Sequence, residues 1–210
     1  MNDIWDALRN TYDRVAKHYV NEFFKELSRK PFDRELLDRF AEGVQGQGTV
    51  CEIGCGPGQI ARYLKDRGAD IFGIDLSEEM IAWARKLNAD ISFEQGNMLY
   101  LDASDDAWAG IVSFYAIIHL RRSDVPLAFA EFYRVLKPSG NLLVSFHGGE
   151  GEVGTEDWFG EPVSVRATLF GDKEIAQYLA SAGFKVEDIL KRPPYEFEYQ
   201  TERVYVFATK

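Results

Sequence analysis

Apolar residues in the first 43 positions recur at steps of three and four. This spacing puts them on one face of a helix, and the face comprises Trp5, Leu8, Tyr12, Val15, Ala16, Tyr19, Phe23, Phe24 and Leu27. Pro31 is expected to begin a second helix, because proline suits the first turn. The pattern therefore predicts a helical N-terminal cap over residues 1–43, followed by a linker that ends at Gly48.

The pattern changes after the linker, where short apolar runs alternate with amphipathic runs. Strands are predicted at 49–53, 69–75, 91–95, 110–116, 141–147, 184–192 and 199–209. Helices are predicted directly after residue 58, after Ser77 as the N-cap residue, and at 124–136 and 172–182. Such alternation predicts an α/β fold with a doubly wound, mostly parallel sheet. The short link between the last two strands predicts an antiparallel C-terminal hairpin at the sheet edge.

A glycine-rich turn follows the first predicted strand. Gly54, Gly56 and Gly58 let the backbone adopt positive φ and let a ligand approach closely. The N–H groups at the start of the next helix face the same place. Asp75 follows 21 residues after Gly54, and an acidic residue at about this distance suits the hydroxyl groups of a ribose. The two features indicate a cofactor that contains a nucleoside.

The residues around the turn distinguish between cofactors. A dinucleotide fingerprint requires G-x-G-x-x-G, but Gln59 stands where its last glycine should be. Glu52 precedes the turn, and a carboxylate is unfavourable beside a pyrophosphate. It suits a cofactor that has a cationic amino-acid end and no phosphate.

Composition and charge narrow the function classes. The chain has 210 residues, of which 46% are hydrophobic, and its formal net charge is −10. This charge disfavours nucleic acid as a partner, and no apolar run is long enough to predict a membrane span. Cys51 and Cys55 alone predict neither a disulfide framework nor a metal site, and the N-terminus has no apolar signal core. A cytoplasmic location is therefore expected.

Five segments in order resemble the motifs of class I S-adenosylmethionine-dependent methyltransferases. They are VCEIGCGPGQ, GIDLSEEMIAWAR, EQGNM, AGIVSFYAIIHL and RVLKPSGNLLVS, and the N-terminal YDRVAKHY is similar to a segment that covers the cofactor in small-molecule members. The resemblance implies a seven-stranded sheet and S-adenosylmethionine as cofactor. One departure is Asn97, where the third motif often has Asp.

The motifs supply candidate site residues. Those expected to hold the cofactor are Tyr12, Tyr19, Glu52, Gly54, Cys55, Gly56, Gly58, Asp75, Leu76, Met80, Asn97, Met98, Phe114, Tyr115 and Ala116. The ammonium group of the cofactor, or the backbone around it, is the expected partner of Glu52. His119 is the candidate general base, because it follows the fourth motif's strand and titrates near neutral pH. A structural hydrogen bond explains His119 equally well.

The sequence indicates less about the methyl acceptor than about the cofactor. Candidates for its pocket are His147, Glu150, Trp158, Arg192 and Tyr195. The acidic stretch at 148–171 fits either a cationic acceptor or a solvated loop. One methyltransferase domain over 1–210 is predicted, with a cap at 1–43, a cofactor-binding core at 49–147, a lid or insertion at 148–171, and a helix and hairpin at 172–210.

The predicted function is methyl transfer to a small molecule. The alternatives are a methyltransferase acting on protein or RNA, a nicotinamide-dependent oxidoreductase, and a module that binds the cofactor without turnover. The acceptor, the atom that is methylated and the oligomeric state stay open at this point.

Overall fold

The N-terminal region folds into two helices, as its apolar periodicity predicts. A computed structural model describes residues 3–210, so Met1 and Asn2 of the predicted cap lie outside the described residues. Helix α1 (Asp3–Phe23) is joined by a short 3-10 helix, η1 (Glu26–Arg29), to α2 (Pro31–Val44). Pro31 occupies the first turn of α2, where its missing N–H costs nothing.

A seven-stranded sheet forms the centre of the molecule. Its strands are β1 (Thr49–Ile53), β2 (Asp70–Asp75), β3 (Phe93–Gln95), β4 (Trp108–Phe114), β5 (Leu136–Gly148), β8 (Lys185–Arg192) and β9 (Glu202–Thr209). The spatial order is β3-β2-β1-β4-β5-β9-β8. Strand β9 runs antiparallel to β5 and β8, and the remaining pairs are parallel. The predicted fold class is confirmed, including the C-terminal hairpin.

The order of the strands reverses direction between β1 and β4. Val50 of β1 pairs with Ile71 of β2 on one side and with Gly110 of β4 on the other. Connections from neighbouring strands leave toward opposite faces here, which opens a crevice beyond the carboxyl ends of the strands. The glycine turn and Asp75 both lie at these ends.

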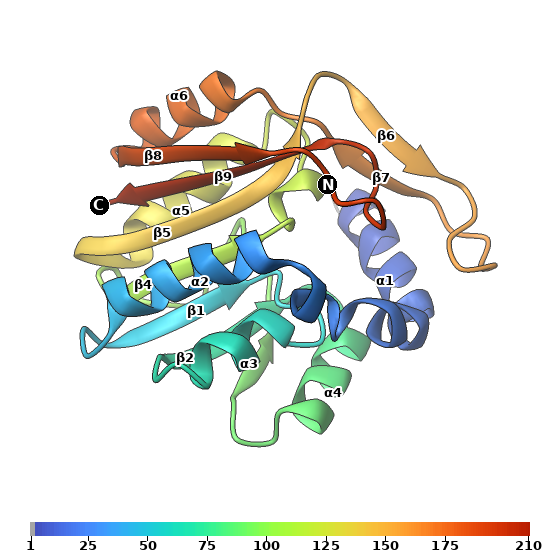
Figure 1. The fold of residues 1–210 in the computed structure, drawn as a ribbon, viewed down its shortest axis with the longest axis horizontal. Helices are drawn as coiled ribbons and strands as arrows, with labels where there is room; N and C mark the ends of the chain where they lie inside the picture. Colours follow the sequence, from blue (N-terminus) through green and yellow to red (C-terminus); the bar gives the residue numbers. More distant parts are fainter. Residues whose placement is uncertain (1–2) are drawn as a thin grey trace.

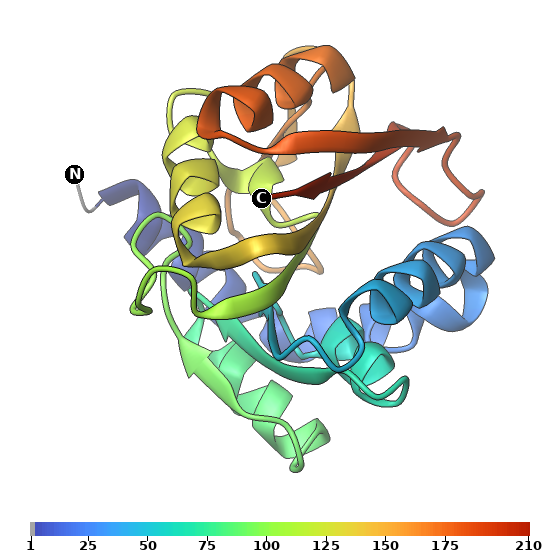
Figure 2. The same ribbon diagram turned by 90° about the vertical axis from the view of Figure 1, so that its left-hand side faces the viewer.

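Helices cover both faces of the sheet (Figures 1 and 2). Helices α2, α3 (Gln59–Lys65) and α4 (Glu78–Leu87) contribute to the core on one face, and α5 (Val125–Val135) and α6 (Asp172–Ala182) to the core on the other. Strand β4 faces both cores, since Ile111 packs into one and Val112 into the other. This two-sided burial explains its unbroken apolar sequence.

Ser77 is the N-cap of α4, as predicted. Its hydroxyl oxygen accepts a hydrogen bond from the backbone N–H of Met80 at 3.1 Å. The cap fixes the start of α4 immediately after β2. Asp75 is thereby placed at the junction between the two elements.

Strand β5 begins earlier than the predicted Asn141. Helix α5 ends at Val135, and the chain enters the strand directly at Leu136. The pairing with β4 shifts register between Trp108 and Gly110, which accommodates the extra residues. The C-terminal residue supplies the missing partners, because Ser139 N–H donates to the Lys210 carbonyl and Lys210 N–H donates to that of Gly140.

The predicted insertion at 148–171 contains regular structure that the sequence pattern did not indicate. Strands β6 (Glu152–Thr155) and β7 (Val165–Thr168) form a separate antiparallel pair. The turn between them carries Trp158 and Phe159. None of the helices in the described part of the chain combines the length and apolar character that crossing a bilayer requires.

Candidate active site

The glycine turn packs against the chain that follows β4. Gly54, Gly56 and Gly58 have φ values of 73°, 51° and 80°. The backbone N–H groups of Gly54 and Cys55 donate to the carbonyl of Ile74 at 2.8 and 3.0 Å. A Cβ at Gly54 would overlap the Cβ of Ala116. Only glycine combines this backbone conformation with so close an approach.

Asp75 ties the turn to the start of α4. Its carboxylate accepts hydrogen bonds from the N–H of Gly56 at 2.7 Å and from that of Ser77 at 2.8 Å. Burial raises the pKa of Asp75, and the two backbone donors oppose that shift. Two lone pairs of the carboxylate are used in this way, and the other two are available to hydroxyl groups.

A cavity begins at Asp75 and extends along the ends of β1, β2 and β4. Thirteen of the predicted residues line it: Tyr12, Tyr19, Gly54, Gly56, Asp75, Leu76, Met80, Asn97, Met98, Phe114, Tyr115, Ala116 and His119. Asn97 holds the loop after β3, because its side-chain oxygen accepts from the N–H of Leu99 at 2.9 Å. The structure therefore brings most of the predicted cofactor residues, and His119, to one place.

Three predicted cofactor residues do not line the cavity. Glu52 is 1% exposed and accepts from the N–H of Ala61 at 2.8 Å, in the first turn of α3. Burial raises the pKa of Glu52. Cys55 is buried, and Gly58 faces the ring of Phe93. These three residues support the conformation of the turn without facing the cavity.

Tyr12 and His119 meet at the far end of the cavity. The Tyr12 hydroxyl lies 2.6 Å from Nε2 of His119, whose Nδ1 lies 3.0 Å from the carbonyl oxygen of Arg166 in β7. A carbonyl only accepts, so Nδ1 carries the proton. Burial lowers the pKa of His119 to about 4, so the ring is neutral near pH 7. Nε2 therefore accepts, and Tyr12 donates.

Aromatic side chains from two separate segments cover this end. The ring of Trp158 lies edge-on to Tyr12 and Tyr19 of α1, with centroids 5.5 and 5.9 Å apart. Phe159 continues the contact to Phe23 of the same helix. The turn between β6 and β7 is thus packed against α1 above the cavity.

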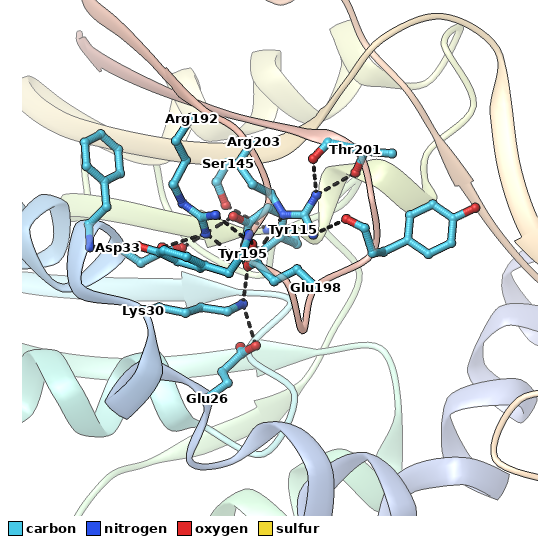
Figure 3. Close-up of polar contacts among 12 residues, drawn as sticks. Glu26, Lys30, Asp33, Tyr115, Ser145, Arg192, Tyr195, Glu198, Thr201 and Arg203 are labelled. Atoms are coloured by element: carbon cyan, nitrogen blue, oxygen red, sulfur yellow. Dashed lines mark hydrogen bonds and ion pairs between the residues drawn. The ribbon is translucent and has the colours of Figure 1, made fainter.

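The predicted acceptor residues fall into two groups. His147, Arg192 and Tyr195 belong to a buried polar network beside Tyr115, part of which Figure 3 shows. Glu150 is exposed at the end of β5, and Trp158 belongs to the aromatic cover. None of the five lines the cavity as the structure has it.

The structure adds lining residues that the sequence patterns did not indicate: Trp5, Leu8, Arg9, Ile53, Ile74, Ser77, Gly96 and Leu120. Leu8 stands four residues before Tyr12 on the same helical face, and this spacing is the signal that could have identified Leu8 as a lining residue. Ser77 was identified only as a helix cap. Arg9 lies outside the apolar stripe and gave no signal.

Comparison with known proteins identifies the family. A family model described as a methyltransferase domain matches residues 50–140. The chain is 33% identical over 149 residues to YqeM of Bacillus subtilis, which is named as a candidate methyltransferase; the match covers 69% of this chain and 56% of that protein. It is 34% identical over 111 residues to the malonyl-[acyl-carrier protein] O-methyltransferase of Erwinia billingiae, covering 53% and 43% of the two chains. The chain belongs to the class I S-adenosylmethionine-dependent methyltransferases.

Solved structures share the fold of this chain. An S-adenosylmethionine-dependent methyltransferase from Mesorhizobium loti superposes with a TM-score of 0.68 at 21% identity, covering 84% of this chain and 96% of that one. The chain spans about half the length of the curated relatives named above. Because that solved structure is only 21% identical to this chain, the likeness concerns the fold alone.

The cavity fits S-adenosylmethionine, the methyl donor of the family. Asp75 presents two free lone pairs where a ribose would lie, and Leu76 and Met80 offer apolar surface beside it. The glycine turn leaves its backbone open, since a Cβ at Gly56 would meet nothing nearer than the Tyr19 ring at 3.9 Å. No pyrophosphate cradle of the dinucleotide type is present in this turn, because Gln59 replaces its last glycine.

Proposed function

We propose that this chain transfers the methyl group of S-adenosylmethionine to a small molecule. The observation that carries the proposal is the cavity that joins Asp75 and the glycine turn to the Tyr12–His119 pair. One end supplies the contacts that a nucleoside requires. The other end supplies polar groups under an aromatic cover, where an acceptor would meet the methyl group.

The cover supports a small acceptor over a macromolecule. Tyr12 and Tyr19 from α1 and Trp158 from the β6–β7 turn lie above the cavity, whereas a protein or RNA segment would need an open groove. The net charge of −10 also opposes RNA. By their names, two relatives methylate malonyl-[acyl-carrier protein] and phosphoethanolamine. We further propose that residues 148–171 act as a lid within one domain.

Positioning is the main task of the residues around the cavity. When bound, S-adenosylmethionine supplies an activated methyl group, and its transfer leaves a neutral thioether. Little charge then needs stabilising at the sulfur. Tyr12, Tyr115 and Ala116 would hold the acceptor in line, and the aromatic cover would exclude water.

His119 suits an acceptor that arrives with a free lone pair. Its pKa of about 4 makes it too weak a base to deprotonate an ammonium group. Its Nε2 already holds the Tyr12 hydroxyl. We therefore propose that His119 orients Tyr12 and that the acceptor reaches the site with its nucleophilic atom already deprotonated.

The cysteines favour a location in a reducing compartment. Cys51 and Cys55 are buried free thiols, which accords with the expected cytoplasmic location.

Production of S-adenosylhomocysteine tests the proposed function. The purified chain should form it from S-adenosylmethionine with at least one member of a panel of small amines, carboxylates, phenols and thiols. Binding of S-adenosylmethionine without turnover on the whole panel would favour a silent binding module. Turnover with proteins or RNA, and not with the panel, would contradict a small acceptor.

A further inference from the structure

A buried carboxylate, Glu198, lies among three buried cations (Figure 3). Its oxygens lie 3.0 Å from Nζ of Lys30, 2.6 Å from Nη1 of Arg192 and 3.7 Å from Nε of Arg203. The four side chains are between 4% and 7% exposed. Burial raises the pKa of Glu198, but hydrogen bonds from Arg192 and Lys30 outweigh it and lower that pKa to about 2. The carboxylate is therefore charged.

The cations exceed the carboxylates once Glu198 is set aside. Lys30 also pairs with Glu26 at 2.7 Å, and Arg192 also pairs with Asp33 at 2.8 Å. Among the side chains described, those of residues 5–210, Arg203 makes an ion pair with Glu198 alone. Nη1 of Arg203 also donates to the carbonyl oxygen of Thr201 and lies 2.9 Å from Nδ1 of His147.

His147 adds no charge of its own to this place. Burial first, and then Arg203, lowers the pKa of His147 to about 3, so its ring is neutral at physiological pH. Without Glu198, the three cations face two carboxylates, Glu26 and Asp33, and one buried positive charge stays uncompensated. Such a place strongly favours an anion.

Glu198 comes from an exposed loop, whereas the cations come from the ends of regular elements. Lys30 immediately precedes α2, Arg192 ends β8, and Arg203 lies in β9. Glu198 belongs to the loop at 193–201, which projects beyond the β8–β9 hairpin (Figures 1 and 2). Phe197 and Tyr199 of this loop are 41% and 60% exposed. The carboxylate can therefore be withdrawn by moving a surface loop, without unpacking the sheet.

Tyr115 lies between the cavity and two of the cations, Lys30 and Arg203. It lines the cavity, and its ring centroid lies 5.6 Å both from Nζ of Lys30 and from the guanidinium carbon of Arg203. Its hydroxyl lies 2.8 Å from that of Tyr205. Lys30, Arg192 and Arg203 do not line the cavity themselves, so an acceptor with its nucleophile beside Ala116 would have to extend past the Tyr115 ring to contact them.

We propose that Lys30, Arg192 and Arg203 form a subsite for an anionic group of the methyl acceptor, a carboxylate or a phosphate. Glu198 occupies this anion subsite when the acceptor is absent and leaves it when the acceptor binds. The inference rests on the proposed function, whose acceptor it describes as an anionic small molecule. The acidic segment at 148–171 does not oppose it, because Glu150, Glu152, Glu156 and Asp157 are exposed to solvent.

Anion binding by the Glu198→Gln variant tests the subsite. Glu198→Gln removes the internal carboxylate, so millimolar phosphate or acetate should raise its melting temperature well above that in chloride of equal ionic strength. Glu196→Gln is the matched control, because it makes the same charge change at an exposed residue of the same loop. The control should show no anion-specific rise. Equal responses of the two variants would overturn the proposal.

The two anions distinguish the sources of the charge. A rise with phosphate alone assigns a phosphate ester, a rise with acetate alone assigns a carboxylate, and a rise with both supports the subsite for either. Arg203→Gln added to Glu198→Gln should abolish the response. A response that survives this second change would place the anion elsewhere and contradict the assignment.

Hydrogen exchange on the unmodified chain provides a test that needs no variant to fold. The Tyr195 N–H donates to Glu198 at 2.9 Å, and the Glu198 N–H donates to the Tyr195 carbonyl at 3.0 Å. Phosphate or acetate, whichever binds, should speed exchange at these two amides by releasing the loop. Unchanged exchange at saturating concentrations of both anions would contradict displacement of Glu198.

Turnover with matched acceptor pairs separates this inference from the proposed function. Phosphoethanolamine is compared with ethanolamine, and glycine with glycinamide, in the assay for S-adenosylhomocysteine. The inference predicts turnover only with the members that carry a phosphate or carboxylate group. Turnover confined to the members that lack a phosphate or carboxylate group would reject the anion subsite and leave methyl transfer intact, whereas failure to bind S-adenosylmethionine would reject the function itself.

Discussion

The Asp75 carboxylate accepts two backbone hydrogen bonds and still has lone pairs available to a ligand. The acceptance of one bond from the turn and one from α4 fixes its carboxylate in space. A ribose would therefore meet an acceptor that is already oriented, so little entropy is lost on binding.

Replacement of Asp75 should weaken cofactor binding far more than it weakens the fold. Asp75→Asn keeps one acceptor oxygen for the backbone but loses charge and a second acceptor. The dissociation constant for S-adenosylmethionine, measured by calorimetry, should rise about tenfold or more, as the loss of hydrogen bonds to a charged group implies. Asp70→Asn, at the other end of β2, should bind normally. Equal affinity in both variants would refute the ribose contact.

The neutral state of His119 should make the fold sensitive to acid. Its pKa is about 4 in the folded chain and 6.5 when unperturbed. Between these values the unfolded chain binds more protons, so stability is lost as the pH falls from 6.5 toward 4. His119→Gln removes this contribution.

Denaturant unfolding at several pH values provides the measurement. The free energy of unfolding of His119→Gln should fall less between pH 6.5 and pH 4 than that of the unmodified chain. His18→Gln, which removes an exposed histidine of α1, should follow the unmodified chain. Parallel curves for all three proteins would show that His119 is not held neutral.

At the residue scale, the sequence indicated the part of the site that lies on the sheet. The carboxyl ends of parallel strands meet at one edge, so Asp75, Asn97 and Ala116 follow from motif and topology together. Trp5 and Arg9 could not be found in this way, because the rotation of α1 over the sheet depends on tertiary packing.

At the element scale, the glycine turn combines two constraints that can be separated. Gly54 needs positive φ, and it also leaves no room for a Cβ beside Ala116. Gly46 has a similar φ of 71°, but a Cβ there would have no neighbour within 4 Å. A comparison of the two glycines isolates the close approach.

Alanine at Gly54 should therefore destabilise the fold more than alanine at Gly46. The left-handed conformation alone costs about 1 kcal/mol, and overpacking adds about 1–3 kcal/mol. Urea unfolding should show the first cost for Gly46→Ala and the sum for Gly54→Ala. Similar losses in the two variants would mean that the turn is less tightly packed than the structure has it.

Elements with a clear hydrophobic period were predictable, and those without one were not. Helix α6 ends at Ala182 before Gly183, as its pattern indicates. Strands β6 and β7 pair with each other in a separate sheet, and half of their residues are exposed, so they carry little apolar signal. The early start of β5 is accompanied by hydrogen bonds with Lys210, which is far away in the sequence: it accepts from the N–H of Ser139 and donates to the carbonyl of Gly140.

At the scale of the whole molecule, the order of elements determined the fold. Alternating strands and helices allow few topologies once crossovers are right-handed. The antiparallel hairpin at the edge follows from the short link between its strands. The partners of the loop at 193–201 were beyond the sequence, because Lys30 and Glu198 meet only after the cap and the hairpin have packed.

Binding of S-adenosylmethionine in the cavity underlies every step of the proposed chemistry, and calorimetric titration of the purified chain tests it most directly. We predict saturable one-to-one binding of S-adenosylmethionine and of S-adenosylhomocysteine, with no binding of NADH under the same conditions. Binding of NADH in place of S-adenosylmethionine, or of neither ligand, would contradict the assignment of the cavity to S-adenosylmethionine.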